Sequence, residues 1–71
     1  MYLTNENIGD FIRGYRIIDG MSQQELADKA GVARSTLALY ESGKRVPDLS
    51  TTARILEALG VRYGFFGNKD C

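Results

Sequence analysis

The sequence predicts an all-α domain of four or five short helices that ends in one short β-strand. Apolar residues recur at steps of three and four up to about residue 60, which is the spacing of a buried helical face. Polar helix-starting residues and helix-ending glycines separate these periodic segments. Beyond residue 60 the spacing changes to alternate residues, which is typical of a strand.

Length and composition indicate one small domain. The chain has 71 residues, of which 44% are hydrophobic and 25% charged, and these values exclude a disordered chain. No apolar run is long enough to cross a membrane, and the N-terminus does not look like a signal peptide, so we expect a cytoplasmic protein. Because so short a chain buries little apolar surface, a second subunit is a natural source of further burial. Cys71 is the single cysteine, and we expect no special role for it.

The first helix is predicted to continue to about Ile18, with Thr4 or Asn5 as its N-cap. Its glycines, Gly9 and Gly14, each lower helix propensity by about 1 kcal/mol relative to alanine, and packing must offset this loss. Residues at helical spacing form its expected buried face: Ile8, Phe11, Ile12 and Tyr15.

The second helix has the clearest start. Ser22 and Glu25 have the spacing of a capping box, in which each side chain accepts a hydrogen bond from a backbone N–H of the other. Met21 and Leu26 form the matching hydrophobic staple. Gly31 can adopt the left-handed conformation that ends a helix and turns the chain. The expected inward stripe of this helix is Leu26, Ala27 and Ala30.

A third helix is predicted from about Arg34 to Ser42, hinged to the second at the glycine. Val32 would fill the corner between them, and Gly43 would end the new helix. Its expected inward residues are Leu37 and Tyr40. This arrangement leaves a polar helical edge facing outward.

A fourth helix follows a short connector. Pro47 cannot continue a helix, and Asp48 is the predicted N-cap, with a carboxylate that accepts backbone N–H bonds. Gly60 would end this helix. Its expected apolar stripe consists of Leu49, Thr52, Ala53, Ile55, Leu56 and Leu59.

The last segment, residues 61–71, alternates like a strand. A lone strand cannot satisfy its backbone hydrogen bonds, so the simplest partner is the same strand of a second subunit. The alternative is a tail that packs irregularly on the helices. We therefore divide the chain into a helical domain, residues 1–60, and a C-terminal dimer contact, residues 61–71. The expected dimer residues are Val61, Tyr63, Phe65 and Phe66.

Charge is balanced overall but unevenly distributed. Nine Lys and Arg residues match nine Asp and Glu residues, for a net charge of zero. Between residues 33 and 47, however, there are three basic residues, Arg34, Lys44 and Arg45, and Glu41 is the only acidic residue. We expect a modest positive face and weak non-specific affinity for nucleic acid, so specificity would depend on base contacts and on dimerisation.

Catalytic motifs are missing from the sequence. The chain has no histidine, which removes the most common general base and most zinc sites. It also lacks a glycine-rich phosphate loop. We therefore expect neither an enzyme nor a bound metal or cofactor.

Residues from about Ile8 to Val61 resemble the Cro/CI-type (XRE family) helix-turn-helix transcriptional regulators, which have a lambda-repressor-like fold. The resemblance is carried by MSQQELADKAGVARSTLALYESGKRVPDLSTTARILEALGV. The short C-terminal strand is similar in organisation to that of the HipB-like antitoxins, whose C-terminal strands pair across a dimer. The resemblance implies a DNA-binding regulator.

The resemblance also implies a set of DNA contacts. The third predicted helix, from about Arg34 to Ser42, matches the recognition helix of the family. Gln23 matches a glutamine that contacts a phosphate and steadies this helix, and Arg34 and Ser35 match the first turn of the helix, which reads bases. Arg16 and Glu41 match a pair that ties the first helix to the end of the recognition helix. Further groove or backbone contacts are implied at Thr36, Leu39, Ser42 and Lys44.

Two positions depart from the family pattern. Ala33 stands where Ser or Thr usually caps the recognition helix, and a missing cap costs about 1 kcal/mol. Leu39 stands where a polar residue is common, so it would touch a thymine methyl group or simply be exposed.

Arg34 is the expected base-reading arginine, since its guanidinium can donate two hydrogen bonds to guanine O6 and N7. The alternative for Arg34 is contact with phosphate or solvent alone. For Thr36, the alternative is a plain helix-surface position. Lys44 and Arg45 would contact phosphates or belong to a solvated loop.

The main functional hypothesis is a homodimeric repressor that binds a palindromic operator in double-stranded DNA. An alternative is an antitoxin that neutralises a HipA-like kinase and represses its own operon. A phage-type switch or a restriction-modification controller would need the same residues.

Overall fold

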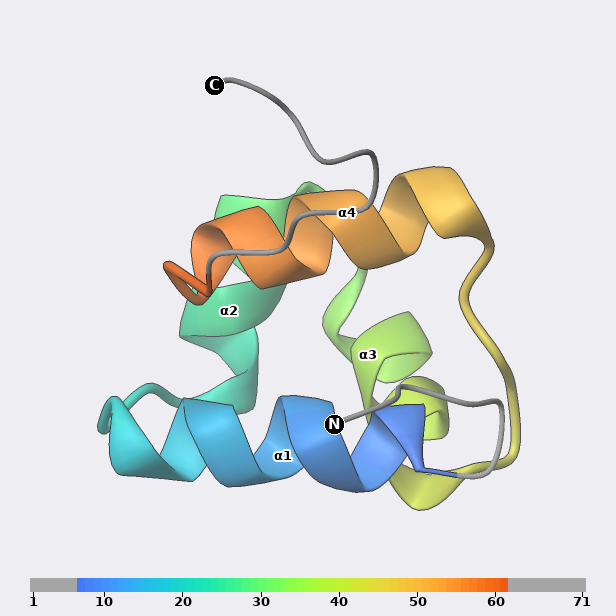
Figure 1. The fold of residues 1–71 in the computed structure, drawn as a ribbon, viewed down its shortest axis with the longest axis horizontal. Helices are drawn as coiled ribbons and strands as arrows, with labels where there is room; N and C mark the ends of the chain where they lie inside the picture. Colours follow the sequence, from blue (N-terminus) through green and yellow to red (C-terminus); the bar gives the residue numbers. More distant parts are fainter. Residues whose placement is uncertain (1–6, 62–71) are drawn as a thin grey trace, which may run out of the picture.

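The computed structural model describes residues 7–61, which form four α-helices (Figure 1). They are α1 (Ile8–Ile18), α2 (Gln23–Ala30), α3 (Arg34–Ser42) and α4 (Leu49–Ala58). In Figure 1, α1 and α4 cross opposite sides of the domain with α2 and α3 between them. Helix α2 packs against α3 and α4, and α1 packs against α3. The all-α prediction is confirmed for these residues, among which there is no strand.

The core takes at least one large side chain from every helix. Ile12, Leu26, Leu37 and Ile55 are fully buried. Burying a side chain of this size contributes about 1.5–3 kcal/mol. Ala27 and Ala30 are also buried. Their small side chains allow α2 to approach its neighbours closely.

Helix α1 starts later than predicted. Its N-cap is Asn7 rather than Thr4 or Asn5, both of which lie outside the described residues. Its end agrees with the prediction, because Asp19 is the C-cap and Gly20 follows with a φ of 72°.

The buried face of α1 is narrower than its apolar spacing predicted. Ile8 and Ile12 are buried, but Phe11 is only half-buried and Tyr15 is 38% exposed. The two aromatic rings lie on the outer side with their centroids 4.6 Å apart. The prediction of a buried Tyr15 is wrong because α1 packs mainly against α3, which covers only one side of it.

Helix α4 is rotated relative to the predicted stripe. Leu49 is 64% exposed and Thr52 is half-buried, whereas Thr51 is buried. The prediction of an inward Leu49 is therefore wrong. The predicted cap is confirmed, since the Asp48 carboxylate accepts a 2.7 Å hydrogen bond from the backbone N–H of Thr51. This bond holds the pKa of Asp48 below its ordinary value of 3.8.

Val61 is the last described residue, and it packs against the core of its own chain. Its backbone N–H donates to the carbonyl oxygen of Leu56 at 3.0 Å. The other predicted dimer residues and the terminal cysteine lie outside the described residues: Tyr63, Phe65, Phe66 and Cys71. None of the helices within residues 7–61 has the length and apolar character that a membrane span requires.

Candidate nucleic-acid interface

Helices α2 and α3 form the corner predicted from the sequence. The Ser22 hydroxyl accepts a 3.0 Å bond from the Glu25 N–H, and the Glu25 carboxylate accepts a 2.8 Å bond from the Ser22 N–H. Gly31 ends α2 in the left-handed conformation, with φ 74° and ψ 32°. A side chain at this φ would strain the backbone, so glycine suits the turn. Half-buried Val32 then packs against the core as the chain enters α3.

Helix α3 presents a polar outer edge. Arg34 and Ser35 in its first turn are exposed, and Thr36 is half-buried, while Leu37 and Tyr40 face the core. The N-cap residue, Ala33, makes no side-chain cap bond, as predicted. This edge has the geometry of a helix that can enter a DNA groove.

A hydrogen-bonded chain of side chains ties this edge to α1 and α2. Arg16 of α1 donates to both carboxylate oxygens of Glu41, from Nε at 2.7 Å and from Nη2 at 3.1 Å. Gln23 at the start of α2 donates its amide Nε2 to Glu41 Oε1 at 3.1 Å. Arg34 in turn donates Nη1 to Gln23 Oε1 at 3.3 Å. The pairing of Arg16 with Glu41 that the resemblance implied is therefore present.

Burial of Glu41 changes the charge of the surface. Its side chain is 4% exposed and is neutralised by Arg16, whose side chain is 13% exposed. The remaining charged residues between positions 33 and 47 are exposed and positive: Arg34, Lys44 and Arg45. The acidic residue that the sequence places beside the basic cluster is thus withdrawn from the surface.

The loop after α3 is anchored by one carbonyl group. The carbonyl oxygen of Leu39 accepts bonds from the backbone N–H groups of Lys44 at 3.0 Å and Arg45 at 3.3 Å. It also accepts a 3.0 Å bond from the Ser42 hydroxyl, which therefore uses its only donor within the helix. The Leu39 side chain is 37% exposed. The backbone of Lys44 and Arg45 is thus held beside the end of α3.

Two hollows flank α2. A hollow of about 200 Å³ is lined by residues of α1, α2 and α3: Arg13, Gln23, Ala38, Glu41 and Ser42. Sequence reasoning did not single out Arg13 and missed its position beside α3. The sequence offered one signal for this position: Arg13 precedes Arg16 by three residues, a spacing that places both on the same side of α1.

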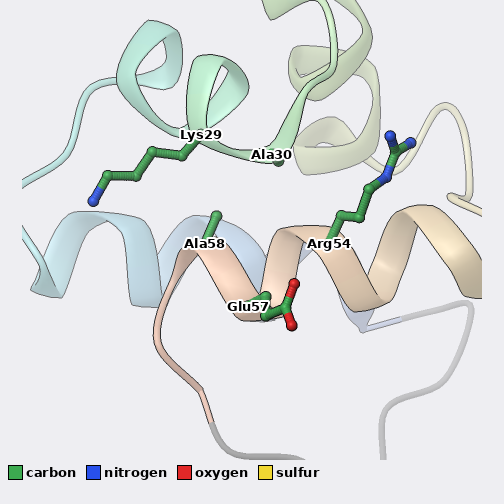
Figure 2. Close-up of a pocket in the computed structure, with 5 residues that line it drawn as sticks. All are labelled: Lys29, Ala30, Arg54, Glu57 and Ala58. Atoms are coloured by element: carbon green, nitrogen blue, oxygen red, sulfur yellow. The ribbon is translucent and has the colours of Figure 1, made fainter.

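The second hollow has a volume of about 450 Å³ and lies between α2 and α4. Figure 2 shows Lys29 and Arg54 extending to opposite sides of Ala30 and Ala58, with Glu57 on α4. None of the expected DNA contacts lines this hollow. Within residues 7–61 no cluster of three or more potential ligand side chains could hold a metal ion.

A family model described as "Helix-turn-helix" matches residues 12–66 of the chain. The match includes the α2–α3 corner and all of α4.

Curated relatives are named as HTH-type transcriptional regulators. The chain is 39% identical over 57 residues to the SPbeta prophage-derived regulator YonR of Bacillus subtilis, an alignment that covers 80% of the chain and 53% of YonR. It is 43% identical over 49 residues to a regulator of Methanothermobacter thermautotrophicus, covering 69% of the chain and 71% of that protein. The chain thus spans about half the length of YonR. A third relative, a regulator of Archaeoglobus fulgidus, is 38% identical over 57 residues. This alignment covers 80% of the chain and 25% of that protein.

Solved structures with a similar fold include two restriction-modification controller proteins. C.AhdI from Aeromonas hydrophila has a TM-score of 0.78 and 30% identity, covering 86% of this chain and 92% of that one. A variant of C.Esp1396I has a TM-score of 0.79 at 24% identity, covering 82% of this chain and 75% of that one, and this likeness shows the fold alone.

Proposed function

We propose that this chain, which belongs to the helix-turn-helix family, is a transcriptional regulator that binds DNA through its helix-turn-helix domain and represses transcription as a homodimer on an inverted-repeat operator. The observation that supports this proposal most strongly is the exposed first turn of α3. There Arg34 and Ser35 face outward, beside a surface from which the acidic Glu41 is withdrawn.

Arg34 is the proposed base-reading residue. Its bond to Gln23 uses one of the five guanidinium N–H donors and limits the positions that the side chain adopts. The edge formed by Nε and Nη2 remains available for two parallel bonds to guanine O6 and N7. Such a bidentate contact discriminates against other bases by about 1–3 kcal/mol. Ser35 would read the adjacent base or its phosphate.

Backbone contacts would position the helix. Gln23 uses one amide hydrogen for Glu41 and keeps a second for a phosphate. Lys44 and Arg45 are exposed in the anchored loop and supply positive charge at the other end of α3. Ser42 would have to turn its hydroxyl away from Leu39 to donate to DNA, so we assign it a weaker contact. Thr36 and the exposed Leu39 side chain would face the groove, the latter toward a thymine methyl group.

Dimerisation would supply the specificity that one small domain lacks. Two recognition helices related by a two-fold axis lie about one DNA turn apart, roughly 34 Å, so the operator would be an inverted repeat. In this proposal residues 1–60 bind DNA and residues 61–71 contribute to the dimer contact. Val61 would take part in both the DNA-binding domain and the dimer contact, because it already packs on the core of its own chain.

Selection of bound duplexes from a random pool tests the proposal. We expect an inverted repeat with guanine at a fixed position in each half-site. Arg34→Ala should lower affinity for that sequence by about 5- to 150-fold per half-site and relax the preference for guanine. Lys44→Gln is the matched control, because it should weaken binding to all duplexes alike. Selection that returns no inverted repeat would contradict the proposal, and a reporter gene behind the operator would show whether regulation is negative.

A second candidate function is control of a restriction-modification system. It is favoured by the likeness to C.AhdI, which includes 92% of that chain at 30% identity. The antitoxin alternative rests on the organisation of the tail, which lies outside the described residues. The product of the adjacent gene distinguishes them, since a methyltransferase or endonuclease supports the controller and a co-purifying kinase supports the antitoxin.

A further inference from the structure

We propose that Arg13 of α1 binds a phosphate of the DNA backbone over the hollow beside α3. This inference rests on the proposed DNA-binding function and adds to it a contact from a helix outside the helix-turn-helix pair. The hollow is lined by Arg13, Gln23, Ala38, Glu41 and Ser42 and has a volume of about 200 Å³. This volume is large enough for one phosphate group.

The position of the hollow favours a backbone contact. One side is formed by Ala38 and Ser42 on α3, whose first turn is the proposed base-reading segment. Another side is formed by Gln23, which also accepts a hydrogen bond from Arg34. A DNA strand that borders the groove occupied by Arg34 would pass close to Gln23, and Arg13 lines the same hollow from α1. Ala38 contributes only a methyl group, which leaves the space open.

The charges around the hollow favour an anion. Glu41 is the acidic residue in its lining, but both carboxylate oxygens accept bonds from Arg16, and Oε1 accepts a third from Gln23. Arg13 is exposed and makes no ion pair or hydrogen bond within residues 7–61. Together Arg13, Arg16 and Glu41 have one net positive charge. The exposed side chain of Arg13 carries it.

The chemistry of arginine suits a phosphodiester. A guanidinium donates two parallel hydrogen bonds to two oxygens of one phosphate, which orients the contact as well as attracting it. Such a contact carries no base information. Arg13 would therefore strengthen binding to every duplex and fix the angle at which α3 meets the groove.

Removal of the Arg13 charge tests the inference in the full chain. Affinity is measured for the selected operator and for an unrelated duplex over a range of salt concentrations. Arg13→Gln should lower both affinities by about tenfold, as expected for loss of a hydrogen bond to a charged group. It should also reduce the slope of log affinity against log salt by about one per subunit.

Arg54→Gln is the matched control, because it removes the same charge from an exposed arginine at the other hollow (Figure 2). We expect it to leave the salt slope almost unchanged. Arg13→Lys should restore most of the slope, since a lysine still neutralises a phosphate. Equal effects of Arg13→Gln and Arg54→Gln on affinity and slope would overturn the inference. Failure of the unaltered chain to bind any duplex would instead overturn the proposed function.

A second measurement maps the contact on the DNA. Neutral methylphosphonates replace the operator phosphates one at a time, and binding of the unaltered chain and of Arg13→Gln is compared. The inference requires one position in each half-site where the substitution weakens the unaltered chain but has little further effect on Arg13→Gln. If all positions weaken both chains by the same factor, the contact is not made.

Discussion

Glu41 connects the three helices that carry the proposed DNA contacts. Glu41 belongs to α3, and its carboxylate accepts hydrogen bonds from Arg16 of α1 and from Gln23 of α2. Gln23 then holds Arg34. Burial of this acidic side chain leaves exposed basic residues on the surface, and Gln23 links it to the arginine proposed to read a base.

We predict that Glu41→Ala destabilises the fold by about 3 kcal/mol, because it leaves Arg16 largely buried without its partner. The free energy of unfolding in urea measures the effect. The paired replacement Arg16→Met with Glu41→Leu should be far less harmful, since it leaves no uncompensated charge. Asp28→Ala, at an exposed acidic residue of α2, is the control and should change stability by less than about 0.5 kcal/mol. Similar losses for Glu41→Ala and Asp28→Ala would contradict the prediction.

The two glycines of helix α1, Gly9 and Gly14, have different roles. Gly9 is buried where α1 meets the end of α3, and a Cβ atom built on it would clash with the backbone oxygen of Tyr40. Gly14 is exposed, and a Cβ atom there would meet nothing within 4 Å. Gly9 therefore permits a close crossing of two helices, whereas Gly14 only lowers helix propensity.

These two glycines make a matched pair of substitutions. Gly14→Ala should stabilise the domain by up to about 1 kcal/mol, because alanine restricts the unfolded chain and favours the helix. Gly9→Ala gains the same propensity but must push α3 away, and we expect a net loss of about 1–3 kcal/mol. Thermal or urea unfolding followed by circular dichroism measures both. A stabilising Gly9→Ala would show that α1 does not approach α3 this closely.

At the scale of the whole molecule, the proposed function depends on two subunits. The net charge of zero gives little general attraction to DNA, so two linked half-site contacts would provide most of the operator affinity. Val61 packs against the core of its own chain, so we expect a chain that ends at this residue to keep its four helices.

We therefore predict that deletion of residues 62–71 separates folding from operator binding. The helical circular dichroism signal should persist, whereas sedimentation should show loss of the dimer. Operator affinity should fall by about 100-fold or more, because the second half-site is no longer linked to the first. A truncated chain that remains dimeric and binds the operator as before would exclude the tail as the dimer contact.

The sequence by itself determined the ends of most helices and the corner between α2 and α3. These features depend on interactions within a few residues, such as the reciprocal bonds of Ser22 and Glu25 or the cap of Asp48 on Thr51. The left-handed turns at Gly31 and Gly43 are equally local. The DNA contacts remain predictions, and they too came from the sequence, because the family resemblance depends on the spacing of residues along the same segment.

Only the tertiary structure decided which apolar residues are buried and which polar residues meet. Tyr15 and Leu49 have helical spacing from core residues, yet both are exposed because no described helix covers those sides of α1 and α4. The close approach at Gly9 and the position of Arg13 beside α3 depend on how helices distant in sequence cross. Periodicity defines the faces of one helix, but burial requires a second helix to cover a face, and the angle between the two is set by packing of the whole core.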